Sequence, residues 1–230
     1  MDAKQEVRER IWRVLQEQRA ARFPGARGRI PNFRGAEAAA ARLAELPEWQ
    51  AADVVKSNPD APQLPVRRRA RDDGKTLYMA VPRLAEVRPF VRVQSDPTIK
   101  RALAEGEPVA VEDLGHVDLV VCGTVAVNRA GVRVGKGGGY SDLELALLVE
   151  TGLIDDATTI VTTVHPLQLL DEELPETDHD FRVDIVVTPD EVVCTRARRR
   201  SPGVIWEHLD AGKIKAIPAL SARAASRDGT

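Results

Sequence analysis

A glycine-rich segment carries the clearest chemical signal in the 230-residue chain. Residues 131–142 read GVRVGKGGGYSD, with four glycines among residues 135–139. Clustered glycines permit backbone conformations that a β-carbon would block, and they let amide N–H groups approach a ligand closely. A predicted helix over 141–150 follows, and its first turn adds unpaired N–H donors and the positive end of the helix dipole. The pattern predicts a phosphate cradle, although a tight structural turn would use the same glycines.

Charged side chains in the segment suit a polyphosphate. Arg133 and Lys136 can place positive charge on one anion, whereas Asp142 suits a Mg²⁺ that accompanies the phosphates. Ser141 and Glu144 also have the spacing of a capping box, so the serine can simply start the helix. The segment matches neither the Walker nor the dinucleotide fingerprint, and both interpretations stay open.

His165 is the best side-chain candidate for proton transfer. It directly follows the apolar run 158–164, which places it at the carboxyl edge where open α/β sheets bind ligands. Its reference pKa of about 6.5 suits acid–base work, and a purely structural histidine is the alternative. Asp184 opens another apolar run and faces either a ligand or a neighbouring turn.

Lys4 and Arg8 lie four residues apart, so both project from one side of an amphipathic helix predicted over residues 2–22. A solvated charged face explains them equally well. Their shared direction gains meaning only if another feature indicates a phosphate.

The elements that must position these residues follow a βαβ order. Apolar runs without clean alternation are typical of strands buried on both faces of a parallel sheet. Helical patterns alternate with them. The predicted strands are 52–56, 76–81, 117–122, 158–164 and 183–188, and the further predicted helices are 36–46 and 97–105.

The chain changes character after residue 195. Residues 196–203 are rich in arginine and end in Ser-Pro-Gly, which interrupts regular structure. A short amphipathic segment surrounds Trp206, and the last ten residues resemble a frayed tail. We therefore predict a globular domain over 1–195, followed over 196–230 by a basic linker, a short amphipathic segment and a flexible C-terminal tail.

Composition excludes several classes of protein. A net charge of -2, with 43% hydrophobic and 30% charged residues, argues against wholesale disorder and against a highly basic nucleic-acid-binding domain. Cys122 and Cys194 cannot form a disulfide scaffold and lack zinc-site spacing, which indicates a reduced, cytoplasmic location. No apolar signal or membrane-spanning run is present. We expect a monomer or homodimer, with nucleic acid an unlikely partner.

The order of these motifs resembles the 5-formyltetrahydrofolate cyclo-ligase family, also called methenyltetrahydrofolate synthetases. The resemblance runs from about residue 4 to residue 195. It is carried by Lys4-x-x-x-Arg8, the strand ending at Cys122-Gly123, the segment Gly131–Asp142, the later Gln168, and Val183-Asp184.

The resemblance implies a three-layer Rossmann-like α/β fold with a mostly parallel central sheet, of the NagB/RpiA/CoA-transferase-like type. It also implies ATP and Mg²⁺ as cofactors. ATP phosphorylates the formyl oxygen of 5-formyltetrahydrofolate, and N10 closes the ring to 5,10-methenyltetrahydrofolate. The implied nucleotide-binding residues are Lys4, Arg8, Arg133, Gly135, Lys136, Gly137, Gly138, Gly139 and Tyr140; the metal residues are Asp142 and Asp184; the catalytic candidates are Lys136, Tyr140 and His165.

Several departures from the family pattern fall where the second substrate's pocket is expected. Ser141 replaces a second tyrosine, His165 replaces an apolar residue, and the segments 30–33, 58–63 and 81–84 are not standard. They resemble the paralogous methenyltetrahydrofolate synthetase domain-containing branch. That likeness implies, as an alternative, a nucleotide-binding paralogue without cyclo-ligase activity that acts on another heterocycle, with a possible link to thiamine metabolism. An RNA-binding or regulatory protein that uses Arg27, Arg29 and residues 196–200 is a further alternative.

Overall fold

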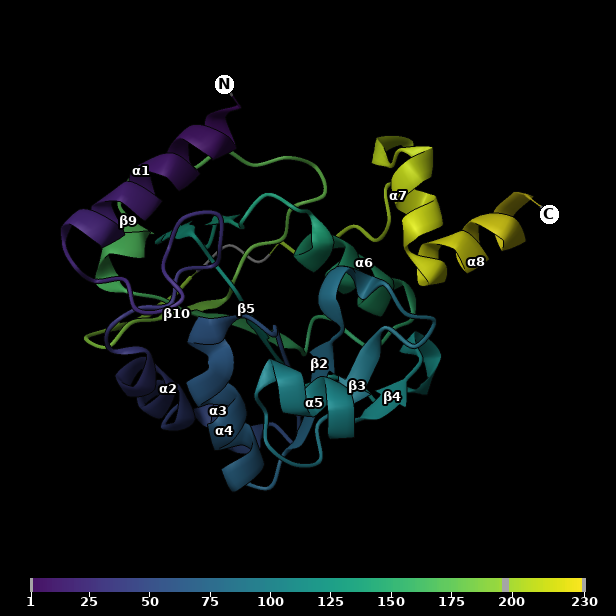
Figure 1. The fold of residues 1–230 in the computed structure, drawn as a ribbon, viewed down its shortest axis with the longest axis horizontal. Coiled ribbons are helices and arrows are strands. Elements are labelled where there is room, and N and C mark those ends of the chain that lie inside the picture. The colour runs from purple at the N-terminus through teal and green to yellow at the C-terminus, as the bar shows by residue number, and fades with distance from the viewer. Residues whose placement is uncertain (1, 196–198, 229–230) are drawn as a thin grey trace.

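An eight-stranded sheet forms the centre of the protein (Figure 1). The computed structural model describes residues 2–195 and 199–228. Its strands lie in the order β11-β10-β8-β5-β1-β2-β3-β4. Their bounds are β1 Val54–Ser57, β2 Thr76–Ala80, β3 Phe90–Arg92, β4 Glu107–Val109, β5 Leu119–Cys122, β8 Thr159–Thr163, β10 Ile185–Val187 and β11 Val192–Cys194.

The middle of the sheet is parallel. Strands β10, β8, β5, β1 and β2 pair in parallel, while β11 at one edge and β3 and β4 at the other pair antiparallel. The five parallel strands are the five that the sequence predicts, with slightly different ends. The antiparallel edge strands are three-residue segments that carry too little pattern to be recognised.

Helices cover both faces of the sheet, which makes the predicted three-layer α/β fold. Alternate residues of each strand enter separate cores, as the pleat requires. Leu119 and Val121 of β5 pack with helices of one layer, whereas Val120 and Cys122 pack with the other. The first layer contains α2 Ala36–Ala44, α3 Pro47–Ala51, α4 Leu64–Asp72 and α5 Ile99–Glu105; the second contains α6 Tyr140–Glu150 and α8 Pro218–Asp228. Helix α7 Ala211–Ala216 precedes α8 and has no buried residue.

Helix α1 (Ala3–Glu17) lies at the end of the molecule on a small second sheet (Figure 1). That sheet pairs β7 Arg133–Val134, β6 Ala126–Asn128 and β9 Leu169–Leu170. Ile11, Trp12 and Leu15 of α1 are buried against it in a third apolar cluster. The helix ends before the predicted residue 22, because Arg19 adopts a left-handed backbone with φ 52°.

The C-terminal segment belongs to the folded body. Residues 218–228 form α8, so the expected frayed tail is wrong over this range. Leu220 and Ile217 are buried in the same core as α6 and the sheet, and this burial holds the segment down. Residues 196–198 of the predicted basic linker lie outside the described residues. The domain boundary at 195 stays a prediction.

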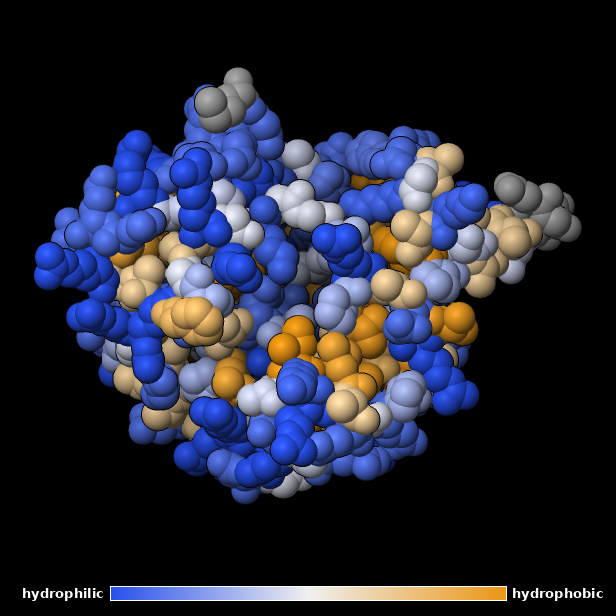
Figure 2. Space-filling view, viewed as in Figure 1, coloured by the Kyte–Doolittle hydropathy of each residue, from blue (hydrophilic) through white to orange (hydrophobic). Residues whose placement is uncertain are grey.

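Single-turn helices connect several elements: η1 Ala61–Gln63, η2 Pro82–Leu84, η3 Val111–Asp113, η4 Pro166–Gln168 and η5 Trp206–His208. Within the described ranges, no helix has the length and apolar character needed to cross a membrane. The surface in Figure 2 is largely hydrophilic, with apolar residues exposed in separate patches.

Burial of Leu220 yields a stability prediction. Leu220→Ala should lower the free energy of unfolding by about 2–5 kcal/mol, because a fully buried side chain leaves a cavity in the core. Chemical denaturation measures the change. Leu103→Ala, at a position 39% exposed on α5, is the matched control and should cost under about 1 kcal/mol. Equal, small losses in both variants would mean that the C-terminal segment does not support the core.

Candidate functional site

The glycine loop, residues 135–139, lies at the amino end of α6. Gly137 and Gly139 have φ values of 103° and 66°, which side chains with a β-carbon rarely adopt. Gly139 is the N-cap residue of α6, and no side chain caps the helix there. A β-carbon on Gly137 would lie 3.3 Å from the guanidinium carbon of Arg8. The glycines therefore give the loop both its turn and its close approach to a cation.

Arg133 and Asp142 form a buried ion pair behind the loop. The Arg133 Nη2 lies 3.0 Å from Asp142 Oδ1, and its Nη1 donates to the Gly123 carbonyl at 2.9 Å. The guanidinium also packs over the Phe181 ring, 4.5 Å from the ring centre. Arg133 is thus fixed in the protein interior, where it orients Asp142 and adds positive potential beneath the loop.

Lys136 extends from the loop to the carboxyl end of β1. Its ammonium lies 3.0 Å from Asp60 Oδ1, and the lysine side chain remains 46% exposed. Arg67 of α4 holds the turn that carries Asp60, because it donates to the carbonyls of Asn58 and Asp60 at 2.6 and 3.1 Å. Burial lowers the pKa of Arg67 to about 10. Lys136 is therefore a mobile cation that faces a fixed carboxylate.

Helix α1 brings Arg8 to the loop and Lys4 to the turn at residues 177–180. Arg8 Nε donates to the Gly135 carbonyl at 2.7 Å, and burial lowers the pKa of Arg8. Lys4 pairs with Asp180 at 2.5 Å and donates to Thr177 at 3.0 Å. Burial opposes ionisation of Asp180, but hydrogen bonds from Lys4 and Thr177 outweigh it and lower the carboxyl pKa. Arg8 therefore contacts the glycine loop, whereas Lys4, one turn earlier on the helix, contacts Thr177 and Asp180.

A fully buried lysine beneath the loop is a feature that sequence patterns missed. Lys56 of β1 pairs with Glu144 of α6, and its ammonium donates to Asn58 Oδ1 at 3.2 Å. Burial lowers the pKa of Lys56 to about 7. A lysine that directly follows two valines in the strand VVKS was the available signal. The capping box suggested by the spacing of Ser141 and Glu144 does not form, because Gly139 is the N-cap residue and Glu144 pairs with Lys56 instead.

Several departures from the family pattern meet beside the loop. Asn58 Nδ2 donates to the Ser141 hydroxyl at 2.8 Å, which joins the segment 58–63 to the first turn of α6. Ile30 packs so closely on Gly123 that a β-carbon there would lie 2.9 Å from it. Residues that are non-standard in the sequence therefore share one wall of the site.

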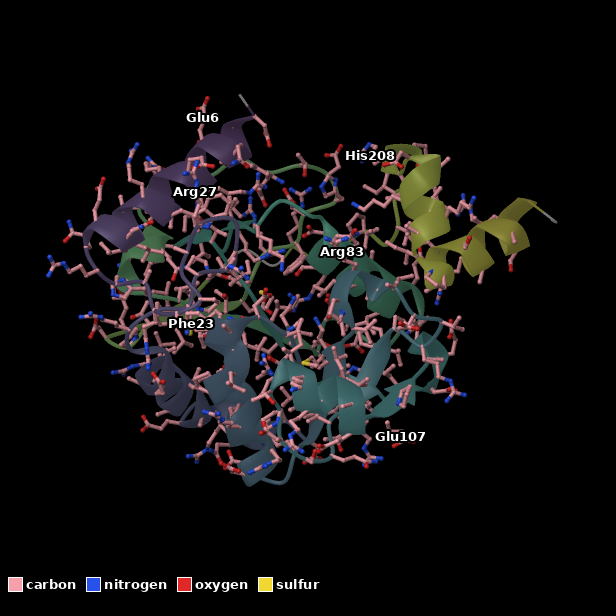
Figure 3. The ribbon with its side chains drawn as sticks, in the orientation of Figure 1. Glu6, Phe23, Arg27, Arg83, Glu107 and His208 are labelled. Carbon is pink, nitrogen blue, oxygen red and sulfur yellow. The ribbon has the colours of Figure 1, made fainter. Side chains whose placement is uncertain are left out.

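The segment 81–84 adds a strained backbone to the same edge of the sheet. Arg83 and Leu84 of η2 have φ values of 61° and 53°, a region costing about 1 kcal/mol or more for residues with a side chain. This turn follows β2 and contacts α6. Figure 3 shows Arg83 beside α6, with Phe23 further along the same face.

His165 has a local structural role. Its Nδ1 accepts a hydrogen bond from the Leu167 N–H at 3.1 Å, and Gln168 completes the cap of η4. The ring meets Phe33 edge-on at 6.1 Å, and burial lowers the pKa of the imidazole. These contacts occupy the acceptor nitrogen of the ring, and they do not connect it to the glycine loop.

Asp184 lies at the opposite edge of the sheet from Asp142. Its carboxylate accepts from the Ile160 N–H at 2.8 Å and pairs with Arg200 at 3.0 Å. Ile160 is near the start of β8, whereas Gly123, beside Asp142, follows the end of parallel β5. The structure therefore does not bring together the two residues predicted to bind metal, Asp142 and Asp184. Arg200, expected in a solvated linker, is instead part of this buried pair.

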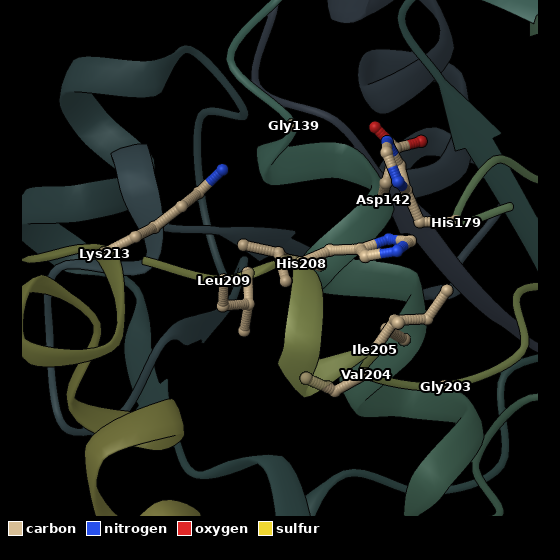
Figure 4. Close-up of a pocket in the computed structure, with 11 residues that line it drawn as sticks. Gly139, Asp142, His179, Gly203, Val204, Ile205, His208, Leu209 and Lys213 are labelled. Atoms are coloured by element: carbon tan, nitrogen blue, oxygen red, sulfur yellow. The ribbon is translucent and has the colours of Figure 1, made fainter. Parts of the chain in front are cut away.

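A cleft of about 80 Å³ separates the loop from the C-terminal segment (Figure 4). Asp142, Gly139 and His179 line one side, and His208 and Lys213 line the other. The His179 and His208 rings meet edge-on at 6.0 Å. In the described part of the chain, no group of three or more His, Cys, Asp or Glu side chains is arranged to hold a metal.

Comparisons with known proteins show the family of the chain. The family model described as the 5-formyltetrahydrofolate cyclo-ligase family matches residues 1–189. Methenyltetrahydrofolate synthase domain-containing proteins from Mus musculus and Bos taurus are 39% and 38% identical over 95% of this chain. The chain spans 62% and 61% of the length of those two relatives.

A solved structure shows the same fold. The 5,10-methenyltetrahydrofolate synthetase of Aquifex aeolicus superimposes with a TM-score of 0.56 at 22% identity, and the match covers 90% of this chain and 99% of that one. The family match over most of the chain, together with this shared fold, shows that the protein belongs to the 5-formyltetrahydrofolate cyclo-ligase family.

Proposed function

We propose that the protein is an ATP- and Mg²⁺-dependent cyclo-ligase that converts 5-formyltetrahydrofolate to 5,10-methenyltetrahydrofolate. The observation that carries the proposal is the glycine loop at the uncapped amino end of α6, with Lys136 in the loop and Arg8 in contact with it. Family membership supplies the reaction class.

The donors at the site fit a polyphosphate with one magnesium ion. Loop amides and the end of α6 can donate to phosphate oxygens, and Lys136 can exchange Asp60 for the ligand because its side chain is half-exposed. Asp142, in the first turn of α6 and paired with Arg133, is the carboxylate that we assign to the metal. Mg²⁺ commonly takes one or two protein carboxylates plus phosphate oxygens, so Asp142 alone suffices.

The chemistry needs positioning and charge neutralisation rather than a nucleophilic side chain. Bound Mg-ATP supplies the phosphoryl group. In the proposed reaction the formyl oxygen accepts that group, N10 attacks the activated carbon, and the oxygen leaves with the phosphate. Lys136 stabilises the charge transferred, and Tyr140 shapes the start of α6. His165 has no part in this scheme, because its acceptor atom is occupied.

A second candidate is a paralogue that uses the same nucleotide site on another small molecule. The hydrogen bond between Asn58 and Ser141 favours it, because both residues depart from the family pattern and meet beside the loop. The cytoplasmic location and the possible link to thiamine metabolism remain predictions with either function.

We predict that Lys136→Ala weakens Mg-ATP binding about tenfold or more, since it removes a charged hydrogen bond to phosphate. Calorimetric titration of the full chain measures the dissociation constant. Lys100→Ala, which removes an exposed lysine from α5, is the matched control. Equal affinities in both variants and the parent would remove Lys136 from the site.

Asp142→Asn should weaken the magnesium dependence of nucleotide binding, because a neutral amide is a poorer Mg²⁺ ligand. Titrations with ATP, with and without Mg²⁺, separate this effect from the lost pair with Arg133. A variant that keeps the parent's full magnesium enhancement would contradict a metal role for Asp142.

The folate reaction has its own test. Incubation with 5-formyltetrahydrofolate and Mg-ATP should produce the methenyl chromophore, and omission of ATP should abolish it. If folded protein binds Mg-ATP but yields no chromophore, the folate proposal fails and the second candidate stands.

A further inference from the structure

The inference concerns Lys213, on α7 beyond residue 189, where the family match ends. Its ammonium lies 3.2 Å from the Gly138 carbonyl and 5.4 Å from the centre of the Tyr140 ring. A β-carbon on Gly139 would lie 3.1 Å from the same nitrogen. The C-terminal segment thus inserts a cation into the turn of the glycine loop (Figure 4).

Lys213 differs from the other cations of the site. Lys136 pairs with Asp60, Arg133 with Asp142 and Lys4 with Asp180. Across residues 2–195 and 199–228, Lys213 has no carboxylate within ion-pair distance, and its contacts above are to a carbonyl oxygen and an aromatic ring. Its full positive charge is therefore available to an anion in the cleft.

The fold holds Lys213 in this position. Asp210 caps α7 and accepts a hydrogen bond from the Lys213 N–H at 2.8 Å. Leu209, before the helix, packs against the main core, and Ile217, after it, is buried there. The lysine is anchored on both sides, so its side chain needs only small rotations to reach a ligand on the loop.

We propose that Lys213 binds the same phosphate chain as the glycine loop, so that the C-terminal segment completes the nucleotide site. This inference rests on the proposed function. The ligand class is a polyphosphate, because the neighbouring donors are the loop amides and Lys136, and the unpaired ammonium adds to them. Lys213 is then a binding residue supplied from outside the matched family core.

The experiment compares Lys213→Met with the parent chain by calorimetry, using Mg-ATP and inorganic tripolyphosphate as separate probes. Both affinities should fall about tenfold or more, because the lost contact is to phosphate in each. Lys215→Met, which removes an exposed lysine from the same helix, should change neither. Lys213→Arg keeps the positive charge and should retain both affinities within a few-fold. A lysine that only supported the shape of the loop would not explain this result.

Salt dependence gives a second readout. The parent's affinity should fall more steeply with ionic strength than that of Lys213→Met, since the variant has one fewer charge facing the ligand. Unchanged or tighter binding by folded Lys213→Met overturns the inference, as does a loss confined to ATP. A parent chain that binds neither probe refutes the proposed function itself and the inference with it.

Discussion

The buried contact between Lys56 and Glu144 is the constraint on which the site depends. It joins β1, in the middle of the parallel sheet, to the first turns of α6, directly behind the glycine loop. Removal of either side chain would leave a buried polar group without its partner, which typically costs about 1–3 kcal/mol. The position of α6, and hence the direction of its free N–H groups, is therefore tied to a single strand.

Other polar contacts extend this constraint to neighbouring loops. Asn58 connects the lysine to Ser141, and Arg67 holds the turn that contains both Asn58 and Asp60. The carboxyl ends of β1 and β5 and the amino end of α6 thus form one hydrogen-bonded unit. Such networks are costly when partly broken, which favours a single arrangement of the site.

Sequence patterns predicted the parallel strands, α6 and the glycine loop, because their apolar runs and glycines reflect local requirements. They did not reveal Lys56, whose burial depends on a glutamate 88 positions later in the chain. They also suggested a solvated Arg200 and a frayed end, because basic residues are usually exposed. In the structure, Arg200 pairs with Asp184 and Leu220 is buried in the core. These tertiary contacts leave no periodic signal in the sequence.

The carboxylates that accompany the loop's cations have a consequence for selectivity. In the proposed site Asp60 already pairs with Lys136 and Asp180 with Lys4, so an anion that binds to either of these two lysines must compete with a carboxylate of the protein. Chloride, or a single weakly charged carboxylate, gains too little to displace them, whereas an extended polyanion engages several donors together. These two ion pairs would therefore favour polyphosphates over small anions, because a small anion must compete with the carboxylates of the protein for the same lysines.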